Sequence, residues 1–173
     1  MGDRELWDGI RRKDAGAFDT VYRTYCTGLQ GFLKQLLGSR QAAEDVTQET
    51  FTSIWQHPNG FDPERGTLRS YLFGAGRKRA VDWWRKQKPH GYPAEEPVAE
   101  NRNETSSLVG NAFGKLPAEQ RTVLWLREVE GQSYAELAEI LGIPEGTVRS
   151  RLFAARKALR QVWRTAPSMK EGS

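Results

Sequence analysis

The chain has 173 residues, of which 38% are apolar and 28% are charged, and its formal net charge is +4. This length allows one ordinary domain or two small ones, and the six Trp, seven Phe and five Tyr residues argue against general disorder. The single cysteine, Cys26, excludes an intrachain disulfide and, with only two histidines, a cysteine–histidine zinc site. No apolar run suggests a membrane span or a signal peptide, so we expect a soluble cytoplasmic protein without membrane insertion.

The charges are unevenly distributed along the chain. Residues 1–88 hold 15 Lys and Arg against 11 Asp and Glu, and residues 108–173 hold 10 against 7. Residues 89–107 hold 1 against 4 and contain three prolines. The two basic segments make a polyanion such as nucleic acid a plausible partner, and the segment between them is typical of a flexible acidic linker.

Apolar residues recur every three or four positions in both basic segments, and strand-like alternation is nearly absent. The pattern predicts an all-α protein with two small helical domains, at 1–88 and 108–165. The linker at 89–107 joins them, and we expect a disordered tail at 166–173.

Three helices are predicted in the first domain after residue 14. The first covers about 15–37 and ends at Gly38, with Gly28 as a candidate break. Ser39 is a candidate N-cap of the second helix, which continues to about residue 57. The stretch PNGFDPERG is a loop by its Pro, Gly and Asp content, and a third helix covers about 67–86.

The second of these helices carries a polar stripe at positions i, i+3, i+4 and i+7, opposite apolar positions such as Val46 and Phe51. By itself this pattern describes an ordinary solvated helix face. The stripe consists of Asp45, Gln48, Glu49 and Thr52.

The third helix ends in RKRAVDWWRKQK, which holds six cations, one carboxylate and two adjacent tryptophans. At about 100° per residue, Trp83 falls on the apolar side with Leu72 and Ala80, and Trp84 falls at the edge of the cationic side. The segment therefore predicts one amphipathic helix, whose apolar side anchors the domain and whose cationic side faces a phosphate backbone.

The second domain contains the pattern of a DNA-binding helix-turn-helix. Ser133 and Glu136 fit a capping box that opens a helix, Gly142 turns the chain, and Pro144 begins a helix that continues to about residue 163. The spacing of a small residue, a glycine turn and two apolar residues matches this motif. A helical hairpin with a solvated basic face is the alternative, but residues 149–164 hold six cations and no carboxylate, which favours DNA.

In such a motif the first half of the second helix enters the major groove. Arg149 and Ser150 are the best candidates for base edges, and Phe153 for a thymine methyl group. The residues at the helix start bring N–H groups close to a phosphate. The candidate DNA contacts are Pro144, Gly146, Thr147, Arg149, Ser150, Phe153 and Lys157.

Several motifs occur in one order along the chain: DAGAFDTVYRTY, AEDVTQETFTSIW, LRSYLFGAGRKRAVDWWRK and LPAEQRTVLWLREVEGQSYAELAEILGIPEGTVRSRLFAARKAL. Together they resemble the extracytoplasmic-function (ECF) group of bacterial sigma factors, over about residues 5–163. The resemblance implies a transcription initiation factor that binds core RNA polymerase and directs it to promoter DNA, both duplex and single-stranded.

The resemblance also assigns roles to the segments. It implies that Asp45, Gln48, Glu49 and Thr52 bind the clamp helices of the polymerase β′ subunit, that the second domain meets the β flap, and that the helix-turn-helix reads the minus-thirty-five element. It implies that the loop around residues 59–67 captures a flipped base and that the following helix recognises and opens the minus-ten element. The minus-ten candidates are Asn59, Phe61, Arg65, Arg77, Lys78, Trp83, Trp84, Arg85 and Lys88.

The chain departs from the family pattern at a few positions. Lys78 stands where the family usually has Asn, Arg79 where it often has an apolar residue, and Ala154 where relatives often carry a basic residue. The family also usually has leucine at the position of Trp84, which predicts Trp84 rather than Trp83 in the core, so the two assignments remain open.

No catalytic constellation, metal site or cofactor site stands out, so we expect a non-enzyme with no small-molecule substrate. The resemblance implies an anti-sigma factor as a partner, which would hold the protein at the inner face of the membrane. Two alternatives remain open: a helix-turn-helix regulator with another N-terminal domain, and a sigma-like adaptor that does not open promoters.

Overall fold

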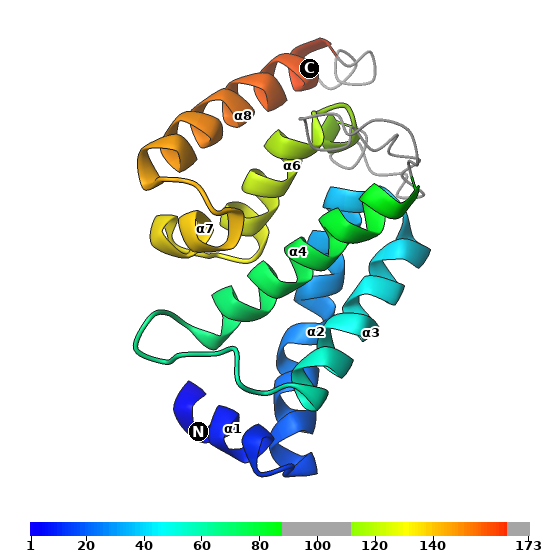
Figure 1. Ribbon diagram of the computed structural model, residues 1–173. Helices are drawn as coiled ribbons and strands as arrows, with labels where there is room; N and C mark the ends of the chain where they lie inside the picture. Colours follow the sequence, from blue (N-terminus) through cyan, green and yellow to red (C-terminus); the bar gives the residue numbers. More distant parts are fainter. Residues whose placement is uncertain (88–111, 166–173) are drawn as a thin grey trace.

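The computed structural model describes residues 1–87 and 112–165, and the regular structure within these ranges is helical (Figure 1). The N-terminal module (residues 1–87) contains α1 (Asp3–Arg11), α2 (Ala15–Leu37), α3 (Arg40–Gln56) and α4 (Leu68–Gln87). The C-terminal module (residues 112–165) contains α6 (Ala118–Leu124), the π-helical segment η1 (Trp125–Val129), α7 (Tyr134–Leu141) and α8 (Glu145–Thr165). The predicted all-α fold is confirmed, and the predicted linker and tail lie outside the described residues.

Local chemistry sets the helix ends where the sequence predicted them. The Ser39 hydroxyl accepts a hydrogen bond from the Ala42 N–H at the start of α3, and Gly38 ends α2 with φ of 68°. Ser133 and Glu136 form the predicted capping box, and Gly142 ends α7 with φ of 65°, a left-handed conformation that glycine adopts without strain. These predictions are all confirmed. Each depends on only a few neighbouring residues, so the sequence alone was enough to make it.

The predicted break at Gly28 is wrong, because α2 runs without interruption from Ala15 to Leu37. Gly28 instead faces the C-terminal module: a Cβ atom at this position would lie 2.7 Å from Glu130 Oε2. The glycine therefore provides room for another part of the chain rather than a turn in the helix.

Aromatic side chains fasten the loop before α4 to the N-terminal module. Trp7 of α1 lies edge-on to Phe61 of the loop and to Tyr71 of α4, with ring centroids 5.3 and 5.4 Å away. The N–H of Leu68 donates to a carboxylate oxygen of Asp3 at 2.9 Å. The short α1 thus fixes where the loop ends and α4 begins.

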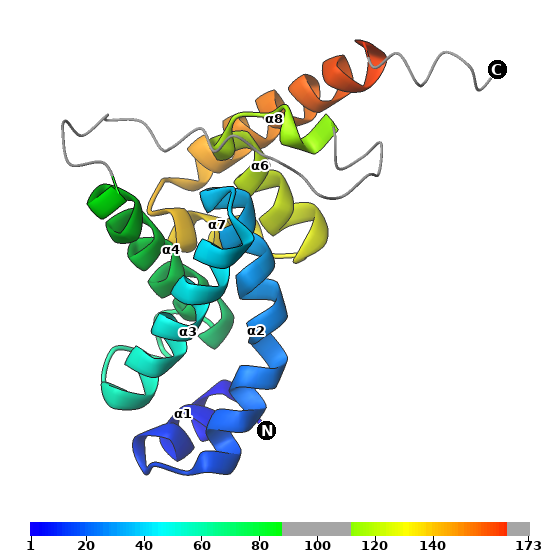
Figure 2. The same cartoon turned by 90° about the vertical axis from the view of Figure 1, so that its right-hand side faces the viewer.

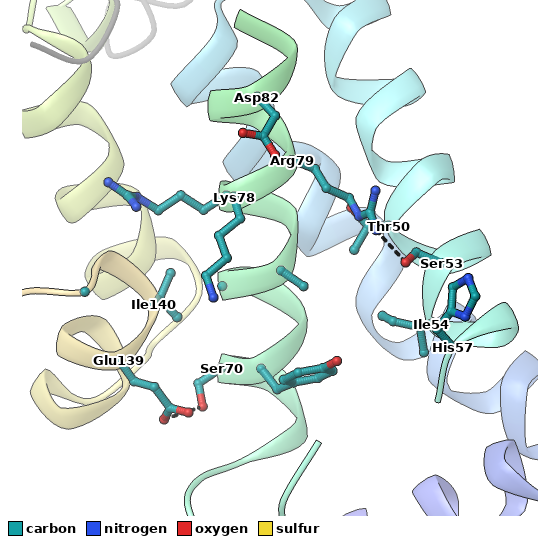
Figure 3. A pocket seen from close by; sticks show the side chains of 15 residues that line it. Thr50, Ser53, Ile54, His57, Ser70, Lys78, Arg79, Asp82, Glu139 and Ile140 are labelled. Carbon is teal, nitrogen blue, oxygen red and sulfur yellow. Dashed lines mark hydrogen bonds between the residues drawn. The ribbon is translucent and has the colours of Figure 1, made fainter. Parts of the chain in front are cut away.

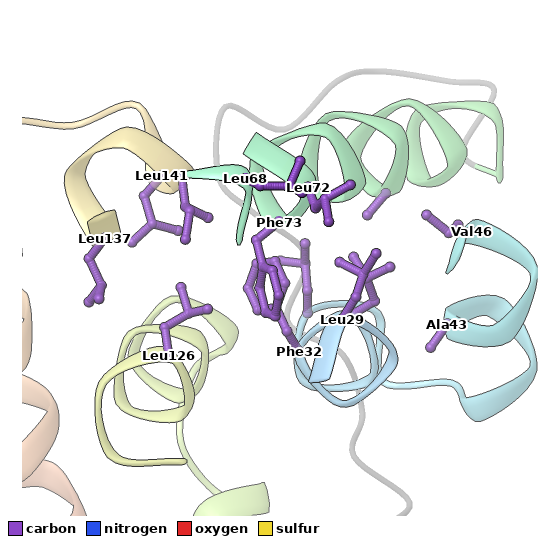
Figure 4. Close-up of a cluster of buried hydrophobic side chains, with 14 of the residues drawn as sticks. Leu29, Phe32, Ala43, Val46, Leu68, Leu72, Phe73, Leu126, Leu137 and Leu141 are labelled. Atoms are coloured by element: carbon purple, nitrogen blue, oxygen red, sulfur yellow. The ribbon is translucent and has the colours of Figure 1, made fainter. Parts of the chain in front are cut away.

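The two modules share one apolar core. In Figures 1 and 2, α7 lies beside α4 while α8 and α1 are at opposite ends of the molecule. Figure 4 shows α7 and η1 side chains pointing at those of α2 and α4, and Phe32 stacks on Phe73 at 5.6 Å. The buried residues that meet there include Leu29, Phe32, Leu68, Leu72, Phe73, Leu126, Leu137 and Leu141.

A buried arginine joins the C-terminal module to the end of α2. Arg121 is 1% exposed, and it donates to the carbonyl oxygens of Gln35 at 2.8 Å and Leu116 at 2.7 Å. The last carbonyls of a helix have no partner within the helix, and a positive charge there is favourable. Burial lowers the pKa of Arg121, but a guanidinium keeps its proton in proteins.

Glu130 is a half-buried carboxylate where the C-terminal module meets α2, and it makes the stability of the fold depend on pH. Burial raises the pKa of Glu130 above its ordinary value of 4.5, and the charge of Arg69 opposes that rise. The folded state therefore binds this proton more tightly than the unfolded state, so the stabilisation is present at low pH and is lost as pH rises past 4.5.

We expect the free energy of unfolding of the wild type, relative to a Glu130→Gln variant, to fall as pH rises from below 4.5 to neutral pH. Urea denaturation at several pH values measures this difference. Glu128→Gln, an exposed neighbour, serves as the control. A difference that is constant with pH, or that grows with pH, would contradict the assignment.

Candidate functional site

The polar stripe of α3 lies on the surface. Asp45, Gln48, Glu49 and Thr52 are all exposed, whereas Val46, Phe51 and Ile54 on the other side of the helix are buried. The amide of Gln48 donates to the Tyr22 hydroxyl at 3.0 Å, which restrains it. Four neighbouring polar side chains thus meet solvent on one side of α3, and two of them, Asp45 and Gln48, are held by hydrogen bonds to neighbouring side chains.

The loop between α3 and α4 has an exposed rim and a buried base. Asn59 and Arg65 are exposed, whereas Phe61 is 3% exposed and packs on Trp7 and Tyr71. Between this loop and α1 lies a cavity of about 450 Å³, lined by Arg4, Trp7, Asp8, Arg11, Asn59, Phe61, Asp62, Pro63 and Glu64. Phe61 therefore holds the loop in place and is inaccessible to DNA in this arrangement.

The cations of α4 have different surroundings. Lys78 and Arg85 are exposed, and Arg85 lies 3.7 Å from the carboxylate of Asp82. Arg77 is half-buried, and Arg79 donates to the Ser53 hydroxyl of α3. Arg79 thus holds α4 against α3, which gives this unusual cation a structural role.

The two adjacent tryptophans of α4, Trp83 and Trp84, differ in how far they are buried. Trp84 is 8% exposed and therefore buried, whereas Trp83 is half-buried and packs against the main apolar cluster. The helical wheel placed Trp83 on the apolar side and the family pattern placed Trp84 in the core, and each prediction is right in part.

A cavity of about 490 Å³ lies between α3, α4 and α7 (Figure 3). Lys78 reaches toward the α7 side of this cavity, and Arg79 toward α3. On the α7 side the lining comes from Glu139, Ile140 and Gly142. Basic groups of one module and the turn of the helix-turn-helix thus face the same space.

The helix-turn-helix has the predicted division between buried and exposed faces. Val148 and Leu152 are buried on α8, and Phe153 is 68% exposed. The large exposed ring is notable because it has no cover within the described residues. The other candidates on this face are Pro144, Gly146, Arg149, Ser150 and Lys157, all exposed, and Thr147, which is half-buried.

Sequence reasoning missed one aromatic residue beside this face. The guanidinium carbons of Arg127 and Arg149 lie 4.8 and 5.8 Å from the ring centroid of Tyr134, within the range of cation–π attraction. Tyr134 is the first residue of α7, directly after the N-cap Ser133. The ring of Tyr134 on α7 restrains the side chain of Arg149 on α8. Only the fold brings these two residues together.

Comparison with known families decides the identity of the chain. The family Sigma-70 region 2 matches residues 21–90, and the family Sigma-70, region 4 matches residues 107–159. The ECF RNA polymerase sigma factor SigL of Mycobacterium tuberculosis is 32% identical, over 88% of this chain and 92% of that protein. The chain belongs to the ECF sigma factors. A further relative of this sigma factor, RpoE of Cereibacter sphaeroides, is 29% identical over 92% of this chain and 96% of that protein.

Solved structures resemble this sigma factor across both modules. RpoE of Bartonella quintana, solved with the anti-sigma factor NepR, has a TM-score of 0.67 and 26% identity, over 86% of this chain and 97% of that one. CnrH, solved with the cytosolic domain of CnrY, has a TM-score of 0.69 at 24% identity and shows the same fold. Among the described residues of the sigma factor, no helix is long and apolar enough to cross a membrane.

The different burial of the two tryptophans predicts different costs of truncation. We expect Trp84→Ala to lower the free energy of unfolding of the sigma factor by about 3–5 kcal/mol, because a buried aromatic side chain leaves a cavity. Trp83→Ala should cost less than about 2 kcal/mol, since part of that ring already meets solvent. Urea denaturation of both variants measures this, and an equal or reversed order would contradict the placement of Trp84 in the core.

Proposed function

We propose that this chain binds core RNA polymerase and directs it to promoter DNA, while the polymerase carries out all catalysis. One observation carries the proposal: a chain that matches sigma region 2 and then region 4 also exposes a cation-rich helix-turn-helix face on α8. The proposed domains are residues 1–88 for polymerase binding and the minus-ten element, and 108–165 for the minus-thirty-five element.

The α3 stripe is the proposed contact with the β′ clamp helices. Its support is the exposure of Asp45, Gln48, Glu49 and Thr52 on one side of a helix that is otherwise packed into the module. Charged and amide groups arranged in this way give specificity and fast association. The C-terminal module is the proposed contact with the β flap.

The face of α8 is the proposed reader of the minus-thirty-five element. Arg149 is placed to form a bidentate contact with a guanine, and Phe153 to meet a thymine methyl group. The exposed start of α8 at Pro144 and Gly146 suits a phosphate, since helix N-terminal N–H groups attract anions.

The loop at residues 59–67 and α4 form the proposed minus-ten surface. Asn59, Arg65, Lys78 and Arg85 are exposed, and Arg77 and Trp83 are half-buried; Lys88 lies outside the described residues. A flipped base costs a few kcal/mol to extrude, which contacts in a pocket and to phosphates must offset. The cavity between the loop and α1 has the size for part of a nucleotide.

An anti-sigma factor is the proposed regulator of the chain in the bacterial cytoplasm. The support is the likeness to RpoE, which was solved with the anti-sigma factor NepR. Such a partner, if anchored in a membrane, would hold the chain at the inner face of that membrane.

Run-off transcription tests the central proposal. We expect core polymerase with this protein to start transcription at a promoter that core polymerase ignores. A genomic template library removes the need to know the promoter. No promoter-dependent product across the library would overturn the proposal, and failure to co-purify with core polymerase would favour a helix-turn-helix regulator. Binding without opening, seen with a fluorescent base in the template, would favour an adaptor.

Charge reversal in the α3 stripe tests the polymerase contact. We expect Glu49→Lys to weaken binding to core polymerase by at least about tenfold, because it leaves an opposed charge in the interface. Asp19→Lys makes the same charge change on the exposed side of α2 and should leave affinity nearly unchanged. Fluorescence anisotropy of the labelled sigma factor with core polymerase measures the affinity of both variants. Equal losses of affinity would show that the stripe is not part of the interface.

Two cations of α8 should behave differently with DNA. We expect Arg149→Ala to reduce discrimination at one base pair of the minus-thirty-five element by about 1–3 kcal/mol. Lys157→Ala should weaken binding to all DNA sequences alike and should reduce the slope of the salt dependence of binding by about one unit. Binding of the polymerase complex to single-base promoter variants at several salt concentrations measures both. A uniform loss for Arg149→Ala would make it a phosphate contact.

A further inference from the structure

Gln48 differs from the two carboxylates of the α3 stripe because an amide both donates and accepts hydrogen bonds. Asp45 and Glu49 only accept hydrogen bonds when they are ionised. Gln48 ends in an oxygen that accepts and an NH2 group that donates, and the two exchange places when the amide turns over. The orientation of this one group therefore decides whether the stripe offers a partner acceptors in a row or a donor between two acceptors.

Tyr22 of α2 fixes this orientation. Nε2 of Gln48 donates to the Tyr22 hydroxyl at 3.0 Å. A hydrogen bond with the Cys26 thiol raises the pKa of Tyr22, and the bond from Gln48 acts in the opposite direction. A bond that raises the pKa of a phenol is one that its protonated form donates, so the single O–H of Tyr22 points to Cys26. Only lone pairs remain for Gln48, which therefore turns its NH2 group inward and its oxygen outward.

The ring of Tyr22 is itself held in place by aromatic neighbours. Its centroid lies 4.9 Å from that of Phe51, which is buried in α3, and 6.3 Å from that of Phe18 in α2. Tyr22 is half-buried and packs against the main apolar cluster, whereas Gln48 is exposed. The packed ring thus gives a fixed anchor to a surface amide that would otherwise rotate freely.

Asp45, at one end of the same row, is held as well. Nε2 of Gln41 donates to an oxygen of Asp45 at 3.0 Å. A carboxylate has about four lone-pair sites, so Asp45 still accepts hydrogen bonds from a partner. Asp45, Gln48 and Glu49 therefore form a row of acceptors on one side of α3, and two of the three are restrained by other side chains of the module.

We propose that Tyr22 is a positioning residue for polymerase binding, which holds the Gln48 amide with its oxygen outward so that the α3 stripe meets its partner as a row of acceptors. The matching groups of the polymerase are then donors, and we expect arginine or lysine side chains there. This inference rests on the proposed function for the identity of the partner, whereas the orientation of the amide does not depend on it. A side chain that is ordered before binding spares the complex the entropy cost of ordering it.

Removing the Tyr22 hydroxyl tests the positioning. Tyr22→Phe keeps the ring that packs on Phe51, and we expect it to weaken binding of the full chain to core polymerase by about fivefold, because the Gln48 amide must then be ordered on binding. Tyr25→Phe is the matched control, since Tyr25 is also a half-buried tyrosine of α2. Its charged neighbours lie on α1, α4 and α7 rather than on α3, and its affinity should be that of the wild type. Fluorescence anisotropy measures all three affinities.

A change at Gln48 separates positioning from a general effect on the fold. Gln48→Glu leaves an acceptor whichever way the group turns, so it does not need Tyr22 to orient it. In that background we expect Tyr22→Phe to cost less than about twofold in affinity, against about fivefold in the wild type. An equal loss in both backgrounds would show that Tyr22 acts through the fold or touches the polymerase itself, and it would overturn the inference.

The restraint on the amide is also measurable without polymerase. Nitrogen-15 relaxation of the Gln48 side chain in the full chain should show a restrained NH2 group in the wild type and in Tyr25→Phe, and a mobile one in Tyr22→Phe. An amide that is equally mobile in all three proteins would overturn the positioning, even if the wild type binds core polymerase. A wild type that has a restrained amide but does not bind core polymerase would instead overturn the proposed polymerase contact, so the two failures are distinguishable.

Discussion

Helix α4 packs against other helices on two of its sides and also carries cations at the surface. On one side it packs on α2 and α3, where Leu72 and Ala80 are fully buried, and on another side it meets α7. Arg79 is used to bond α3 and Arg69 to bond α7, which leaves Lys78 and Arg85 at the surface. The loop at residues 59–67 leads directly into α4, and α7, which precedes α8, packs on α4, so both depend on how α4 is held.

Features that depend on a few adjacent residues could be predicted from the sequence. The Ser39 cap, the capping box at Ser133 and the turn at Gly142 each rest on chemistry within four positions, and all three are confirmed. The division of α8 into a buried side with Val148 and an exposed side with Phe153 follows from one periodic stripe, because α8 packs on one side only.

Features that depend on distant segments could not be predicted in this way. Phe61 was assigned to a base-capture loop, yet it is buried by Trp7, which is more than fifty positions away. Gly28 was interpreted as a break because the sequence near it holds nothing that indicates Glu130 above it. Tyr134 and Arg149 carry no sequence signal for each other, and only the turn between α7 and α8 brings them within 5.8 Å.

The glycines of α2 also bear on how such a protein can change over time. Replacing glycine by alanine inside a helix usually stabilises the protein by about 1 kcal/mol, so such changes are among the easiest routes to a more stable chain. At Gly31 the same change would strengthen the helix but place a Cβ atom 2.9 Å from the indole ring of Trp125, whereas at Gly28 it would meet only the end of the flexible Glu130 side chain. At Gly31, helix stability and contact between the two modules therefore favour different residues.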